Sequence, residues 1–128
     1  MKLSQAKADL FVPDGMRLEE ALARTTLLGV GAHQDDLEFM AYAPILRAFS
    51  TEGEWFTGVT VTNGAGSARD SFYKDYTDEQ MMDVRRIEQR KAAQIGDYAA
   101  MLQLHHPSSA VKDAKNIGPV DEIGRAHV

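Results

Sequence analysis

The stretch Thr26-Leu-Leu-Gly-Val-Gly-Ala-His-Gln-Asp-Asp-Leu-Glu38 decides how this chain is expected to fold. Its first five residues, 26–30, are aliphatic or β-branched and carry no charge, which is typical of a buried parallel strand. Polar residues follow, and a helical pattern then runs over 37–49. Ligands bind beyond the carboxyl ends of the strands in open parallel sheets, so this strand-to-helix turn is the expected place for a site.

Outward from this stretch, predicted helices and strands alternate. They occupy residues 17–25 (helix), 26–30 (strand), 37–49 (helix), 55–62 (strand), 78–95 (helix) and 98–104 (strand). The long helix begins with the capping box Thr77-Asp-Glu-Gln80 and is closed by Gly96. This β-α-β-α-β order predicts an α/β fold, a Rossmann-like parallel sheet with right-handed crossovers and helices on both faces.

The predicted sheet has only three strands, which leaves an open edge on a buried apolar strand. We therefore expect the chain to stop short of its own fold after the third strand, with residues 1–122 forming the N-terminal part of a single α/β domain. The tail 123–128, IGRAHV, is what the string ATCGGAAGAGCACACGTC would encode, and that string is similar to the start of a common sequencing adapter. We expect a non-native tail, with Glu122 a hybrid codon and no functional role for Arg125 or His127.

Composition narrows the class of protein. The 128 residues are 44% hydrophobic and 26% charged, as in one soluble globular domain, and no apolar run is long enough for a membrane span or a signal peptide. The expected location is the cytoplasm. A net charge of -5 argues against nucleic acid or an anionic membrane as partner and favours a small-molecule substrate. With no cysteine, any metal must be held by His, Asp or Glu.

The densest chemistry lies in the turn after the first strand. His33 and Asp36 are three residues apart and can both reach one ion, and imidazole with carboxylate suits Zn²⁺ or another divalent transition metal. Asp35 lies between them and is the candidate general base. The structural alternative makes Asp36 the N-cap of the following helix and makes His33 and Asp35 a solvated hydrogen-bonding pair.

This turn, Ala32-His-Gln-Asp-Asp36, resembles the A-H-P-D-D-E motif of the PIG-L/LmbE-like family of zinc-dependent de-N-acetylases. Gln34 stands where the family usually has Pro, and the intervening Leu37 moves Glu38 out of the final position.

The resemblance spans roughly residues 26–113. Thr62-Asn-Gly64, Arg85-Arg-Ile-Glu88 and Ala92-Ala-Gln-Ile-Gly96 are similar to the family's T-x-G, R-x-x-E and A-A-x-x-G progression. The segment Leu104–Ser109 looks like the Y-P-S-S segment of a family branch that contains HQDD. The chain thus resembles the N-terminal portion of such an enzyme.

The resemblance implies zinc ligands at His33 and Asp36, a general base at Asp35, and hydrolysis of an N-acetyl group on an N-acetylglucosamine-type sugar or related small amide. It also implies that Arg85 contacts the substrate, although an ordinary helix pair with Glu88 is the alternative. The third ligand in the family is a late histidine, beyond the end of this chain, so we expect the chain alone to be weak or inactive. His105 and His106 are interpreted as solvated loop residues rather than replacement ligands.

Two other functions remain open at this point. Gly29-Val-Gly31 after a strand suggests a dinucleotide-binding enzyme, although Gln34 occupies the place of the third glycine of G-x-G-x-x-G. A non-catalytic carbohydrate- or partner-binding module would keep the fold without the metal. Sensitivity to a chelator separates both from a metal-dependent deacetylase. The sequence does not specify the oligomeric state.

Overall fold

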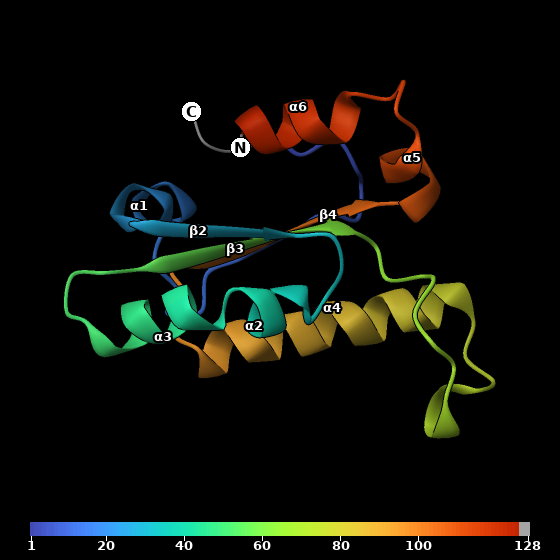
Figure 1. Ribbon diagram of the computed structural model, residues 1–128, viewed down its shortest axis with the longest axis horizontal. Coiled ribbons are helices and arrows are strands. Elements are labelled where there is room, and N and C mark those ends of the chain that lie inside the picture. Colours follow the sequence, from blue (N-terminus) through green and yellow to red (C-terminus); the bar gives the residue numbers. More distant parts are fainter. Residues whose placement is uncertain (126–128) are drawn as a thin grey trace.

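Four strands form one open sheet in the order β1-β4-β3-β2 in a computed structural model that describes residues 1–125 (Figure 1). The strands are β1 (Asp9–Phe11), β2 (Leu27–Gly31), β3 (Phe56–Thr62) and β4 (Ala100–His106). The helices are α1 (Leu18–Arg24), α2 (Asp36–Met40), α3 (Tyr42–Ser50), α4 (Asp78–Ile95), α5 (Ser108–Lys112) and α6 (Gly118–Arg125), with a 3-10 turn η1 (Ser71–Tyr73).

Helices cover both faces of this sheet, and its three longer strands are parallel. In Figure 1, α1 and α6 lie above the sheet, whereas α2, α3 and α4 lie below it. The predicted Rossmann-like α/β class is confirmed. The N-terminus lies beside α6, so the two ends of the described chain meet on the upper face.

The sequence reading missed β1. It has three residues and pairs antiparallel with β4, placing Leu10 opposite Leu102. Asp9 forms an ion pair with Arg90 of α4 at 2.5 Å, and the Arg90 guanidinium lies over the ring of Phe11. One edge of the parallel strands is therefore covered by the N-terminal segment, and the uncovered edge of the described sheet is that of β2.

The prediction that β2 is fully buried is wrong. Leu28 and Val30 are 43% and 44% exposed, whereas every residue of the adjacent β3 is buried. β2 has a strand partner on one edge alone among the described residues, and its side chains alternate between the two faces. The apolar composition of β2 indicated a strand correctly, but composition does not show whether helices cover both faces of that strand.

The helix predicted over 37–49 is two helices. α2 ends at Met40, Ala41 leaves the helical region with φ -111° and ψ 25°, and α3 starts at Tyr42. Pro44 explains the break because it has no N–H to donate to a carbonyl one turn earlier, but it is tolerated in the first turn of a new helix. The two short helices together lie under β2 and β3.

The third predicted strand is shifted by two residues, since β4 runs over 100–106 rather than 98–104. Asp97 adopts a left-handed conformation with φ 54° after α4. Tyr98 then turns into the core, where its ring meets that of Phe56 edge-on at 4.8 Å. By contrast, α4 spans the predicted 78–95 and carries both hydrogen bonds of the Thr77 capping box.

The lower core beneath the sheet positions the turn after β2. Leu37 is 1% exposed and packs where a side chain at position 29 or 58 would lie if these residues were not glycine. A Cβ at Gly29 would lie 2.7 Å from the Phe56 ring, and one at Gly58 would lie 2.8 Å from Leu37. Both glycines are therefore required for close packing, which fixes the start of α2 against the sheet.

Residues 123–125 belong to α6. Ile123 packs against the upper core, the apolar cluster formed by Ala21, Val59, Val61, Ala100, Leu102 and Leu104. Their origin as a non-native tail stays a prediction, and His127 lies outside the described residues. Within residues 1–125, no helix has both the length and the apolar character to cross a membrane.

Candidate functional site

The turn from β2 into α2 brings His33, Asp35 and Asp36 to the carboxyl edge of the sheet. The Asp36 carboxylate accepts a hydrogen bond from the backbone N–H of His33 at 2.8 Å. The cap position of α2 is Asp35, and its side chain makes no capping bond. The alternative in which Asp36 serves only as an N-cap is therefore wrong, because Asp36 is the first residue of the helix and its carboxylate turns back to the loop.

His33 and Asp36 place two potential metal donors side by side. The distance from His33 Nδ1 to Asp36 Oδ2 is 3.5 Å. Two donors that each lie about 2.0–2.2 Å from one tetrahedral ion are about 3.3–3.6 Å apart. Both side chains are open to solvent, being 54% and 33% exposed. The pair therefore fits two coordination positions of a Zn²⁺-like ion.

A full coordination set is not present in the part of the chain that the structure describes. Within residues 1–125, no three His, Asp or Glu side chains are grouped so that they could hold a metal ion. Catalytic zinc generally takes three protein donors and one water molecule. The described residues supply two of these donors at most.

Asp35 has an unusual backbone conformation, with φ 73° and ψ -20°. A residue with a side chain seldom adopts this left-handed region, and such outliers concentrate at functional sites. Its N–H donates to Oε1 of Gln89 at 3.0 Å, and its carboxylate accepts from Arg85 at 2.8 Å. Asp35 is thus held by two side chains of α4, while its own side chain stays 47% exposed.

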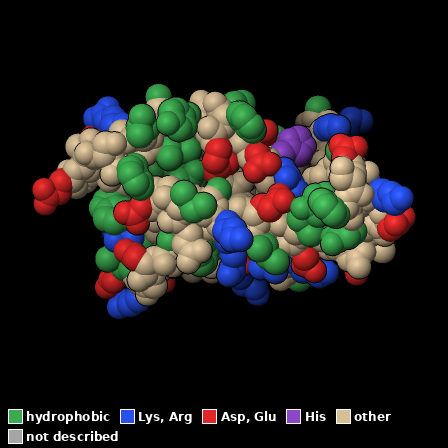
Figure 2. All heavy atoms as spheres, turned by 90° about the horizontal axis from the view of Figure 1, so that it is seen from below, with side chains coloured by type: hydrophobic (Ala, Val, Ile, Leu, Met, Phe, Trp, Pro, Cys, Tyr) green, Lys and Arg blue, Asp and Glu red, His purple; other side chains and the backbone are tan. Residues whose placement is uncertain are grey.

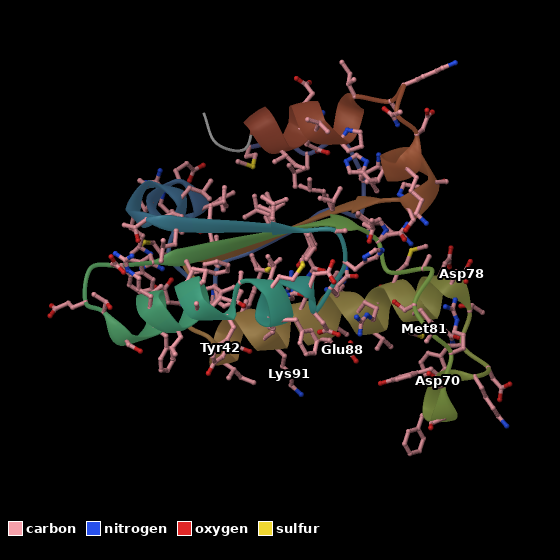
Figure 3. All side chains as sticks on the ribbon, viewed as in Figure 1. Tyr42, Asp70, Asp78, Met81, Glu88 and Lys91 are labelled. Atoms are coloured by element: carbon pink, nitrogen blue, oxygen red, sulfur yellow. The ribbon has the colours of Figure 1, made fainter. Side chains whose placement is uncertain are left out.

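Arg85 joins three groups of the site. Its guanidinium donates to the Asp35 carboxylate, to the backbone carbonyl of Gln34 at 3.1 Å and to Glu88 at 2.7 Å. The helix pair with Glu88 that was considered from the sequence is therefore present, but it is one contact among several. Figure 3 labels Glu88 on α4, below the sheet. The Arg85 side chain is 20% exposed, so part of it faces solvent beside Asp35.

Sequence reasoning missed the buried residues behind the turn. Gln89 is fully buried and donates through Nε2 to Glu38 at 2.9 Å. The hydroxyl of Tyr98 donates to the same Glu38 oxygen at 2.7 Å. The local signal available was the position of Gln89, four residues after Arg85 and therefore on the same side of the helix.

Gln34, at the position where the resemblance expected Pro, is also buried. Its Nε2 donates to the carbonyl of Thr62 at 3.1 Å and to Oε1 of Gln103 at 3.3 Å. Its own Oε1 is buried without a hydrogen-bond partner among the described residues. Gln34 therefore ties the turn to the end of β3 and the middle of β4 rather than facing the open site.

His105 and His106 were expected to be solvated loop residues, and this expectation is wrong. Both belong to β4, and His106 is 5% exposed. His106 Nε2 lies 2.5 Å from a carboxylate oxygen of Glu122 in α6. His105 is partly buried and has φ 68° at a bulge between β3 and β4, and burial lowers its pKa from the ordinary value. Neither histidine joins His33 and Asp36.

The glycines that suggested a dinucleotide site have a packing role. A Cβ at Gly31 would lie 3.0 Å from Cβ of Asp36, so this glycine allows α2 to approach the end of β2 closely. Gly29 makes room for Phe56 and Leu37, as described above. These contacts account for both glycines without a bound phosphate.

Comparison with protein families shows that the GlcNAc-PI de-N-acetylase (PIG-L) family model matches residues 28–125. That range begins in β2 and ends with α6, so it contains the candidate site residues described above. Comparisons with curated proteins and with solved structures give no match for this chain.

Proposed function

The chain belongs to the GlcNAc-PI de-N-acetylase family, and on that premise we propose that the turn after β2 is a zinc-dependent centre for hydrolysis of an N-acetyl amide. The family indicates a deacetylase type of hydrolase that acts on small N-acetylated sugars. The proposed substrate is an N-acetylglucosamine-type sugar or a related small amide. The observation that carries the proposal is the 3.5 Å separation of the His33 and Asp36 donors. Asp35 lies between these two residues in sequence and is held by side chains of α4.

We propose His33 and Asp36 as two of the zinc ligands. Zinc would supply a Lewis acid that polarises the amide carbonyl and acidifies water. The carboxylate of Asp36 is already oriented by the His33 N–H, which reduces the rearrangement needed to bind an ion. The third protein donor is proposed to come from outside residues 1–125, as the resemblance to the family implies. Another divalent transition metal could take the same donors.

Asp35 is the proposed general base. It accepts a proton from a water molecule whose oxygen bonds to the amide carbonyl carbon. The carbon–nitrogen bond then breaks, releasing acetate and an amine that takes up a proton. The contact with Arg85 fixes which way the carboxylate points. The solvent-facing part of Arg85 is proposed to bind an oxygen of the substrate next to the reacting amide.

Two variants test these roles separately. In the full-length protein, which would supply the third donor, we expect one zinc ion to bind in a calorimetric titration and acetate to be released, both lost with a chelator. His33→Ala should lose the zinc, whereas Asp35→Asn should keep the zinc and lose about 10²–10⁴-fold in turnover. Asp75→Asn, at an exposed position away from the site, is the matched control.

Retained turnover in Asp35→Asn would disprove the base role, and unchanged zinc binding in His33→Ala would disprove the ligand role. Sugar binding that survives both the chelator and Asp35→Asn would support a non-catalytic carbohydrate-binding module instead. Hydride transfer with a nicotinamide cofactor, unaffected by the chelator, would support the dinucleotide-binding alternative.

A further inference from the structure

We propose that Gln89 is a positioning residue that holds the backbone of Asp35, and that Glu38 and Tyr98 determine which way the Gln89 amide faces. The chemical importance of this arrangement rests on the proposed function, because it assumes that Asp35 is the base. The contacts themselves do not depend on that assumption. None of these three side chains is among the proposed ligands, so their effect would reach the site through Asp35.

The conformation of Asp35 needs an external partner. A residue other than glycine held at φ 73° is strained, and this conformation persists only where the surroundings determine it. The N–H of Asp35 donates to Gln89 Oε1 at 3.0 Å. Because Gln89 is 0% exposed, water cannot easily replace this acceptor.

The orientation of the Gln89 amide follows from its other end. The NH₂ group donates to Glu38 Oε1 at 2.9 Å, and an ionised carboxylate can only accept. The carbonyl oxygen must then face the opposite way, towards Asp35. If the amide turned over, an NH₂ group would meet the Asp35 N–H, and a carbonyl would meet the Glu38 carboxylate.

Tyr98 fixes Glu38 in turn. Its hydroxyl donates to Oε1 of Glu38 at 2.7 Å, and its ring packs edge-on against Phe56 in the lower core. Burial, together with the neighbouring Glu38 carboxylate, raises the pKa of Tyr98, so the hydroxyl remains a donor across the physiological range. The chain of contacts runs from the core through Glu38 and Gln89 to the backbone of Asp35.

α4 therefore holds Asp35 at two points. Arg85 binds the carboxylate, and Gln89 binds the backbone N–H. The two residues are four apart, so they project from the same side of the helix. This double contact sets both the conformation of the Asp35 backbone and the direction of its side chain.

The test measures the Asp35 amide by NMR hydrogen exchange in Gln89→Leu and Gln89→Glu. Loss of the acceptor in Gln89→Leu should speed exchange of the Asp35 amide about tenfold. In Gln89→Glu, two carboxylates would face each other, and the Asp35 amide resonance should shift. Zinc affinity should fall by about 10–100-fold in both variants. Gln94→Leu and Gln94→Glu, at an exposed position of α4, are the matched controls and should change neither quantity.

A reciprocal exchange gives a sharper test than either single variant. In Glu38→Gln combined with Gln89→Glu, the carboxylate at position 89 can accept from Asp35 and from the new amide at position 38. The Tyr98 hydroxyl can still donate to the carbonyl of that amide. We expect the double variant to restore the Asp35 amide resonance and the zinc affinity to within about threefold of wild type.

An Asp35 amide that keeps its exchange rate and resonance in Gln89→Leu would overturn the inference. Rescue of the melting temperature without rescue of the Asp35 amide would also overturn it, because that pattern indicates a purely structural role. If Gln89→Leu fails to fold, Tyr98→Phe keeps the ring packing and should speed the same exchange about threefold. Full-length wild-type protein that binds no zinc would overturn the proposed function, whereas the Asp35 amide would still decide this inference.

Discussion

Two histidine–carboxylate pairs lie towards the carboxyl ends of the parallel strands, and they differ in almost every physical respect. His33 and Asp36 are three residues apart, with a donor separation of 3.5 Å, and they are 54% and 33% exposed. His106 and Glu122 are sixteen residues apart, with a separation of 2.5 Å, and they are 7% and 10% exposed. The first pair is local and open, and the second joins a strand to a helix across the upper core.

The difference between the pairs lies in the remaining hydrogen-bonding capacity of each carboxylate. Glu122 accepts from His106 and also from the backbone N–H and hydroxyl of Ser4, so its oxygens are occupied by protein donors. Asp36 accepts only from His33 among the described residues, which leaves it free to bind an ion. A histidine with a carboxylate thus forms a cross-link in one place and a candidate metal site in the other.

The largest expected effect separates the pairs by stability. Glu122→Ala leaves His106 buried without its partner and removes the acceptor of both Ser4 donors, and we expect it to lower the free energy of unfolding by about 3–5 kcal/mol. His33→Ala removes an exposed side chain and should change the same quantity by less than about 0.5 kcal/mol. Urea denaturation measures both values. Equal effects of the two variants would contradict the distinction between cross-link and open site.

The second prediction uses zinc to separate the same pairs. Zinc at about 100 times its dissociation constant should raise the free energy of unfolding of the full-length wild-type protein by about 2.7 kcal/mol. His33→Ala should abolish this increase, whereas His106→Ala should keep it although its own stability is lower. An increase that depends on His106 would place the metal at the buried pair and would contradict our assignment.

Local signals made much of the fold predictable. The capping box at Thr77 made the start of α4 predictable, because its two hydrogen bonds lie within four residues of sequence. The short strand β1 had no such signal, since its three residues are ordered by pairing with β4 far along the chain. The exposure of Val30 was also not predictable, because it depends on which helices cover β2 rather than on the strand itself.

The difference between local signals and contacts made far along the chain also applies to the site. His33, Asp35 and Asp36 lie in one turn, so their spacing alone placed them together. Gln89 contacts Asp35 across 54 positions of sequence. Its four-residue spacing from Arg85 was the available local signal, but that spacing does not indicate which residue Gln89 contacts. The buried state of His106 depends on α6, whose Glu122 was interpreted as a hybrid codon.

Several apolar side chains near the site are exposed to solvent. Phe39 is 85% exposed and Met40 is 71% exposed, and both belong to α2, which also carries Asp36. Figure 2 shows hydrophobic side chains gathered in patches between charged ones on the lower face, which α2, α3 and α4 cover.

The smallest expected effect is a dependence of stability on pH that comes from the buried pair. Burial by itself would raise the pKa of Glu122, but hydrogen bonds from the Ser4 backbone, His106 and the Ser4 hydroxyl outweigh it and hold the pKa below its ordinary value. A carboxyl whose pKa is lowered on folding stabilises the protein above its unfolded pKa, near 4.5, and this stabilisation disappears as the pH falls through the folded pKa.

Each unit by which that pKa is lowered corresponds to about 1.4 kcal/mol. Glu122→Gln should therefore remove part of the decline in the free energy of unfolding below pH 4.5. Ser4→Ala, which keeps the backbone donor and removes the hydroxyl, should reduce the decline by a smaller amount. Urea denaturation between pH 3 and pH 6 measures these slopes. If Glu122→Gln and wild type declined in parallel, the carboxylate of the buried pair would not be held by its donors in the way that sets it apart from Asp36.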